Sequence, residues 1–159
     1  MSMRTDTSLE ERVARLEYRE ELKELRAAYC HRIDGRDWDG YAALFAEDAH
    51  LDFGPVGEFH GREEIREFAE HVVGANHPFL SHMLHNPILD VDVESGTATG
   101  QWYFEVPCTF EDGSAGWIQG TYEDAYVRED GEWLFAEVVA DFNYFADYEE
   151  GWAGIVADR

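Results

Sequence analysis

Apolar residues recur at helical spacing, with charged residues between them, over the first 35 positions of the chain. Ser8 and Glu11 form a capping-box pair, which predicts that a helix begins there. Asp34-Gly35 is typical of a helix end. The apolar stripe between these signals consists of Leu9, Val13, Leu16, Leu22, Leu25, Ala28, Tyr29 and Ile33. The pattern therefore directs Tyr29 toward the core.

Two shorter helices and one strand are expected before residue 75. Asp37 can cap a second helix, which contains Trp38, Tyr41, Leu44 and Phe45. Alternation over 49–53 indicates a short strand, and the residues at 54–57 are typical of a turn. Residues 61–73 predict a third helix, whose apolar face carries Ile65, Phe68, Ala69 and Val72.

The apolar period changes to two after residue 80. Strands are predicted at 81–93, 97–106, 116–128 and 132–141. A turn that contains glycine separates each of these strands from the next. We therefore expect one α+β domain over 1–159, a cone-shaped α+β barrel in which a curved antiparallel sheet wraps around three helices from the N-terminal half. Its core is expected over about 9–145.

Strand periodicity also assigns faces, because alternate residues of a strand share one side of the sheet. In the strand at 97–106, the side facing the helices should carry Ala98, Gly100, Trp102, Phe104 and Val106. In the last strand, the apolar face should carry Leu134, Ala136, Val138, Ala140 and Phe142, with Glu137 and Asp141 opposite. The segment 146–159 is predicted to be a lid or a subunit contact, because aromatic residues continue through Tyr144, Phe145, Tyr148 and Trp152.

The charge is strongly acidic, with 35 acidic and 12 basic side chains and a net charge of -23. Such a surface repels phosphate backbones and anionic lipid heads, so we expect neither nucleic acid nor membrane partners. The acidic residues are spread along the chain, and Lys23 is its only lysine. This composition favours a solubilising charge over a cationic-substrate site, and it resembles proteins of salt-loving microbes.

Cysteine usage and hydropathy place few further constraints on the chain. Cys30 and Cys108 are too few and too far apart for a disulfide framework or a zinc knuckle. The charged segment 1–19 does not resemble a signal peptide, and no stretch is long enough to cross a bilayer. A cytoplasmic location is the expectation.

A phenol, a carboxylate and an imidazole stand out as candidate chemistry, at Tyr29, Asp34 and His82. Taken singly, they are typical of a core tyrosine, a helix-end cap and an ordinary histidine. Together in an apolar cavity they could move a proton between carbon and oxygen. His82 and His85 are three residues apart, which places them on opposite faces of a strand, so no metal site is expected there.

Four segments resemble the SnoaL-like branch of the nuclear-transport-factor-two-like superfamily: 29–39, 59–65, 82–87 and 98–103. Within that branch the chain is most similar to bile acid 7α-dehydratase and, more distantly, to scytalone dehydratase. The resemblance covers about 9–145. It implies a cone-shaped α+β barrel around a deep cavity, assembled as a dimer or trimer, with no cofactor.

The same resemblance implies roles for the three polar residues. Tyr29 matches a tyrosine that hydrogen-bonds the substrate carbonyl, Asp34 a catalytic aspartate and His82 a catalytic histidine. Two polar positions of that family differ here, since an expected aspartate falls on Val106 and an expected arginine near Phe142. These replacements indicate an apolar cavity wall and a changed substrate.

The expected activity is that of a dehydratase or isomerase, with His82 as base, Asp34 orienting it and Tyr29 donating to the developing oxyanion. The substrate would be a small hydrophobic ring compound. Its predicted binding residues, which ordinary core packing would equally explain, are Trp38, Phe53, Met83, Trp102, Phe104, Val106, Tyr122 and Phe142. The alternative is a non-catalytic binding or small-subunit module of the same fold.

Overall fold

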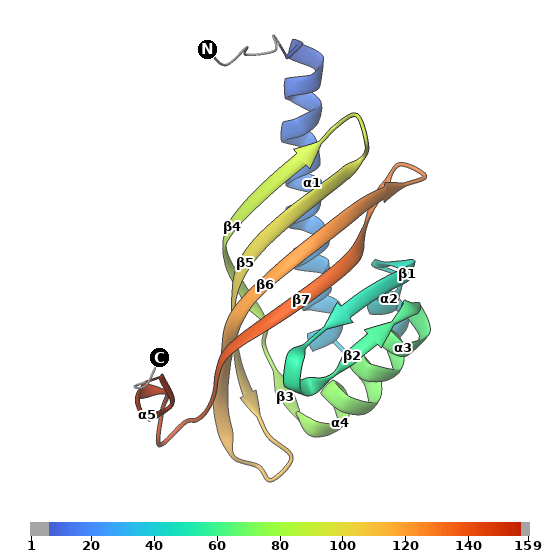
Figure 1. Ribbon diagram of the computed structural model, residues 1–159. Helices are drawn as coiled ribbons and strands as arrows, with labels where there is room; N and C mark the ends of the chain where they lie inside the picture. The colour runs from blue at the N-terminus through green and yellow to red at the C-terminus, as the bar shows by residue number, and fades with distance from the viewer. Residues whose placement is uncertain (1–6, 157–159) are drawn as a thin grey trace.

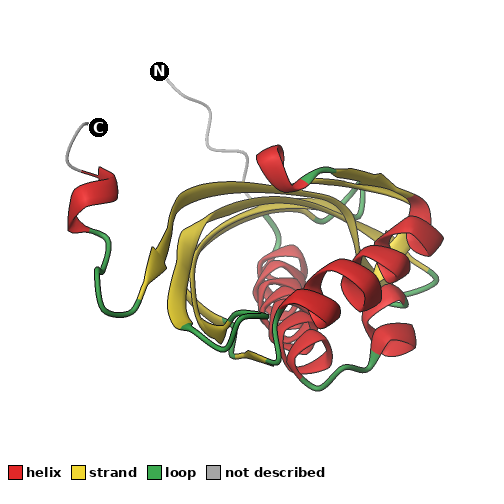
Figure 2. Ribbon diagram, turned by 90° about the horizontal axis from the view of Figure 1, so that it is seen from below, coloured by secondary structure: helices red, strands yellow, loops and turns green. Residues whose placement is uncertain are grey.

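The first helix, α1 (Leu9–Asp34), lies along the concave side of a long curved sheet (Figures 1 and 2). The computed structural model describes residues 7–156. The side chain of Ser8 accepts a hydrogen bond from the Glu11 amide, as the capping signal predicted. The apolar stripe is buried only in its second half. The expectation was wrong for Leu9, Val13 and Leu16, which are exposed because this end of α1 projects past the sheet (Figure 1).

A seven-stranded sheet forms the other layer, in the order β2-β1-β7-β6-β5-β3, with β4 also paired to β5. Its strands are β1 (Phe45–Asp52), β2 (Glu58–His60), β3 (Phe79–Leu80), β4 (Met83–Asp92), β5 (Thr97–Thr109), β6 (Ala115–Glu129) and β7 (Glu132–Asp147). The predicted α+β class and the antiparallel run from β4 to β7 are confirmed. Period-two patterning did not indicate that β1 joins β7 in parallel.

The helices that follow α1, apart from the last, lie beside it on the same side of the curved sheet (Figure 2). Asp37 caps α2 (Trp38–Ala42) by accepting from the Gly40 amide. The prediction that Leu44 and Phe45 are helical was wrong, because Phe45 begins β1 and lies opposite Phe135 in the sheet. The third helix runs through α3 (Gly61–Phe68), a π-helical turn (Ala69–Val73) and α4 (Gly74–Asn76). A last short helix, α5 (Ala153–Val156), stands apart from this layer.

The inner face of the sheet carries the core. In β5 the predicted inner residues are buried, with Trp102, Phe104 and Val106 among them. In β7 the predicted face was wrong near its start. Ala136 is bulged between the paired residues Phe135 and Glu137, so Trp133 and Phe135 point inward in place of Leu134 and Ala136. A bulge reverses the alternation because it inserts one unpaired residue.

No helix in the described range is both long and apolar enough to cross a membrane.

Candidate active site

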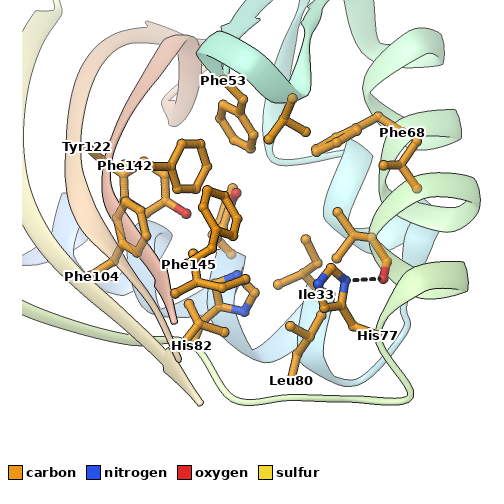
Figure 3. Close-up of a pocket in the computed structure, with 16 residues that line it drawn as sticks. Ile33, Phe53, Phe68, His77, Leu80, His82, Phe104, Tyr122, Phe142 and Phe145 are labelled. Carbon is orange, nitrogen blue, oxygen red and sulfur yellow. Dashed lines mark hydrogen bonds between the residues drawn. The ribbon is translucent and has the colours of Figure 1, made fainter. Parts of the chain in front are cut away.

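A cavity of about 90 Å³ lies between the inner face of the sheet and the helices (Figure 3). Its wall is almost entirely apolar and draws on α1, the third helix, β5, β6 and the end of β7. The side chains with polar atoms among its lining residues are Tyr29, His77, His82 and Tyr122. Polar atoms are thus few and placed on separate elements, as in sites that orient a small apolar ligand.

His82 and Asp34 are joined by two hydrogen bonds. Asp34 is the last residue of α1, and His82 lies between β3 and β4. The imidazole Nδ1 is 2.6 Å from Asp34 Oδ1, and the backbone N–H of His82 donates to Asp34 Oδ2 at 2.8 Å. An ionised carboxylate only accepts, so Nδ1–H points to Asp34, and in the neutral tautomer the lone pair is on Nε2. The ring borders the cavity, and its side chain is 9% exposed.

Two phenols lie on the same cavity wall, and one of them contacts the histidine. The Tyr29 ring lies edge-on to the His82 ring, with centroids 6.2 Å apart, and Tyr122 is 6.1 Å from Tyr29. Burial raises the pKa of Tyr29, although the nearby Arg26 opposes this, and burial raises the pKa of Tyr122 well above that of a free phenol. Both hydroxyls therefore keep their protons at neutral pH, and the Tyr122 hydroxyl interacts with that of Tyr29.

A fully buried arginine lies behind these phenols. The Arg26 guanidinium carbon is 4.3 Å from the Tyr29 ring centroid and 3.9 Å from that of Tyr122. Its Nη2 pairs with Asp124 Oδ1 at 3.2 Å, and neither side chain is exposed. Burial lowers the pKa of Arg26, but Asp124 and the phenols of Tyr29, Tyr122 and Tyr126 together raise it by more, and the net shift is upward. The cation is thus permanent and lies against two of the cavity's hydroxyl-bearing rings.

The sequence reading missed this buried pair. Arg26 falls on the same helical stripe as Leu22, Leu25 and Tyr29, and Asp124 falls between Tyr122 and Tyr126 in the alternation of β6. A charged residue on a predicted buried face is itself a signal of a paired charge, because an unpaired one is too costly. The signal for this ion pair is therefore one charged residue on the buried face of α1 and one on the buried face of β6.

His77 is a second imidazole on the cavity that the sequence reading passed over. Its Nδ1 lies 3.1 Å from the carbonyl oxygen of Val73 and donates to it (Figure 3). Burial lowers the pKa of His77. At neutral pH it is therefore uncharged, and its Nε2 is an acceptor.

The predicted binding residues divide into two groups. Those that line the cavity are Phe53, Phe104, Val106, Tyr122 and Phe142. Three others lie elsewhere. Trp102 donates its indole N–H to Tyr126 at 3.0 Å deep in the core, Met83 is 42% exposed, and Trp38 packs under Arg36. Met83 lies opposite Glu105 on the outer face of the sheet. Trp102 shares the inner face of β5 with Phe104 but lies further along the strand, and Trp38 is on α2.

Comparison with known proteins identifies relatives. A family model described as a SnoaL-like domain matches residues 14–139. An uncharacterized protein of Mycobacterium tuberculosis is 32% identical over 128 residues, covering 76% of this chain and 82% of its own length.

Two solved structures share the fold. A hexachlorocyclohexane dehydrochlorinase (LinA, type 2) superposes with a TM-score of 0.80 at 22% identity, over 85% of this chain and 91% of its own. A scytalone dehydratase-like protein of Novosphingobium aromaticivorans superposes with a TM-score of 0.76 at 22% identity, over 84% and 89%. At these identities, the likeness establishes the common architecture.

Proposed function

Since the chain belongs to the SnoaL-like family, we propose that it is a lyase or isomerase that needs no cofactor and works by proton transfer. The observation that carries this proposal is the hydrogen-bonded pair of His82 and Asp34, 2.6 Å apart, on the wall of an apolar cavity. Its substrate would be a small hydrophobic ring compound with an acidic C–H bond. Under this proposal His82 is the base of the cavity, and the substrate is to be identified by experiment.

In the first step, His82 acts as general base. Nε2 takes a proton from a carbon next to an electron-withdrawing group such as a carbonyl. The imidazolium that forms is stabilised by Asp34, which already holds Nδ1–H and cannot rotate away because its second oxygen accepts the His82 amide. The carboxylate therefore sets both the tautomer and the direction of the ring.

Tyr29 would stabilise the negative charge that develops on the substrate oxygen. Its hydroxyl is a protonated donor in a site with little water, where one such donor contributes about 3 to 4 kcal/mol to the transition state. Tyr122 and the neutral His77 border the same space and would contact the substrate's remaining polar group. Arg26 would act through the phenol rings without reaching the substrate.

The second step separates the two candidate reactions. In a dehydration, the enolate expels a hydroxyl from the next carbon, a carbon–carbon double bond forms, and the imidazolium proton leaves with the hydroxide as water. In an isomerisation, the proton returns to a different carbon. The names of both structural neighbours denote eliminations, of hydrogen chloride or of water. This favours elimination.

A non-catalytic binding module is the second candidate. The cavity of about 90 Å³ is small for a polycyclic ligand, and Val106 and Phe142 give its far wall no charge. These features fit a fold that merely holds a small apolar molecule. They also fit an enzyme for a single-ring substrate, and the hydrogen bond between His82 and Asp34 favours the enzyme.

The test is deuterium exchange and elimination on a panel of single-ring β-hydroxy ketones and halogenated rings, followed by mass spectrometry and by the absorbance of the conjugated product. Wild type is compared with His82→Gln and Asp34→Asn, and His85→Gln is the matched control on an exposed histidine. We expect each site variant to lose about 10²- to 10⁴-fold in rate and the control to keep it. Equal rates in His82→Gln would refute the mechanism, and binding without any turnover would favour the module.

A further inference from the structure

Two histidines face each other on the outer side of the β1–β2 hairpin, away from the cavity. His50 and His60 are direct partners in the antiparallel register of the two strands. Their rings are stacked, with centroids 4.5 Å apart and planes 8° from parallel. Because the intervening turn centres on residue 55, residue 50 lies opposite residue 60 in the hairpin.

Two glutamates complete the cluster. Glu58 lies two residues before His60 on the same face of β2, and its Oε2 is 3.3 Å from His50 Nε2. Glu137, the partner of His50 on β7, places its Oε1 3.1 Å from His50 Nδ1. Ligand atoms of His50, Glu58 and His60 all lie within 4.8 Å of one another. The three side chains therefore converge from two strands on one point.

We propose that His50, His60 and Glu58 form a binding site for a divalent transition metal of the zinc class, with Glu137 as its supporting carboxylate. Two imidazoles and one carboxylate are a donor set that zinc takes in proteins, with a fourth position left for water. The site is separate from the cavity and does not depend on the proposed reaction.

The hydrogen bonding of His50 orients it for this role. A carboxylate cannot donate, so in the metal-free chain both His50 nitrogens donate, Nδ1–H to Glu137 and Nε2–H to Glu58. A metal ion would take the place of the Nε2 proton between His50 and Glu58, and the Nδ1–H bond to Glu137 would remain. Metal-bound histidines commonly hold their second nitrogen in this way, on a carboxylate. Bonds of 2.0 to 2.2 Å in a tetrahedral site separate two ligand atoms by about 3.3 Å. The Nε2 to Oε2 distance already has this value.

Ion pairing alone explains only part of the arrangement. It accounts for His50 between two glutamates, but it does not account for His60, whose ring lies on that of His50. The net negative charge of the whole chain attracts cations of every kind, but only weakly. Paired imidazoles select transition metals over magnesium or calcium, which prefer oxygen ligands. Selectivity therefore distinguishes a built site from general attraction.

A bound metal would clamp the hairpin that carries one side of the cavity. The edge strand β2 spans only Glu58–His60 and pairs only with β1 among the described strands. Phe59 of β2 stacks on Phe68 at 4.2 Å, and Phe53 beside the turn lines the cavity together with Phe68. Holding His50 and His60 together would hold these aromatic rings in place.

The test is calorimetric titration of the untagged chain with zinc chloride in excess magnesium chloride, with melting curves at each zinc level. Wild type is compared with His60→Ala, Glu58→Gln and Glu137→Gln, and with His85→Ala, an exposed histidine on β4, as control. We expect one zinc per chain, at least tenfold weaker binding in the first two variants, and a ten- to hundredfold loss in Glu137→Gln. Zinc should raise the melting temperature of wild type and of the control but not of His60→Ala.

Three outcomes would overturn the site. The first is that magnesium abolishes zinc binding, and the second is that His60→Ala binds zinc as tightly as wild type. The third is that His85→Ala loses as much affinity as His60→Ala, which would mean that surface histidines bind zinc without a defined geometry. Because His60 and Glu58 are exposed, their variants are expected to fold, and wild-type melting without zinc serves as the reference.

Discussion

Replacing Asp124 by Asn should destabilise the protein more than any single surface change, because it leaves the cation of Arg26 buried without a counter-ion. Arg26 and Asp124 are 3.2 Å apart with no exposed side-chain surface. Asn keeps the shape of the side chain and can still accept from Tyr126, which donates to Asp124 at 2.6 Å. The substitution therefore isolates the charge.

The magnitude follows from how each partner can respond. Removing one member of a buried ion pair typically costs about 3 to 5 kcal/mol. A guanidinium cannot shed its proton, so Asp124→Asn should bear the full cost. The converse variant Arg26→Met should cost less, because burial already raises the pKa of Asp124 and the carboxyl can take up a proton. Its cost should grow as the pH rises.

The assay is guanidinium unfolding followed by tryptophan fluorescence, with calorimetry as a check that the transition is two-state. For a chain of this size, about 3 to 5 kcal/mol corresponds to a fall of roughly 6 to 20 °C in the melting temperature. The double variant Arg26→Met/Asp124→Asn should recover part of the loss, since no uncompensated charge remains. A cost below about 1 kcal/mol for Asp124→Asn, or a double variant no more stable than the sum of the singles predicts, would refute the reasoning.

Three further predictions concern packing, pH and salt. Gly120→Ala should cost about 1 to 3 kcal/mol or more in chemical unfolding, because a Cβ there would meet the carbonyl of Asp141 and lie 2.8 Å from Phe104 Cζ; an unchanged midpoint would contradict this. The lowered pKa of His77 means that the unfolded chain binds the proton more readily, so its contribution to stability is present above about pH 6.5 and lost as the pH falls below that value. The pH dependence of unfolding should therefore be shallower in His77→Gln than in wild type between pH 7 and pH 5, and identical slopes would exclude the effect. Dialysis from about 1 M to 0.01 M salt should lower the melting temperature, because the net charge of -23 is then poorly screened, and a melting temperature that does not move would argue against a salt-adapted surface.

Local patterns in the sequence determined most of the elements and the inner face of β5. Ser8 and Asp37 cap α1 and α2 as predicted, and the alternation over 97–106 assigned the inner face of β5 correctly. These features depend on neighbours within a few residues, where the 3.6-residue and two-residue periods operate. The order Tyr29, Asp34, His82 along the chain likewise suggested a shared site.

Contacts between distant residues were decided by the tertiary structure. The bulge at Ala136, the parallel pairing of β1 with β7 and the His82–Asp34 bond across 48 positions each depend on how strands and helices dock. For Trp102, the strand pattern predicted that the side chain points inward. It did not predict that the side chain lies away from the cavity.

The cluster of His50 and His60 shows both what the local sequence determines and what only tertiary packing decides. The turn after Phe53 is visible in the sequence, and it places His50 opposite His60. Only the docking of β7 beside β1 brings Glu137 to His50 and orients the ring. A sequence determines which residues share a face because that depends on backbone period, whereas partners on other elements depend on long-range packing that no local pattern encodes.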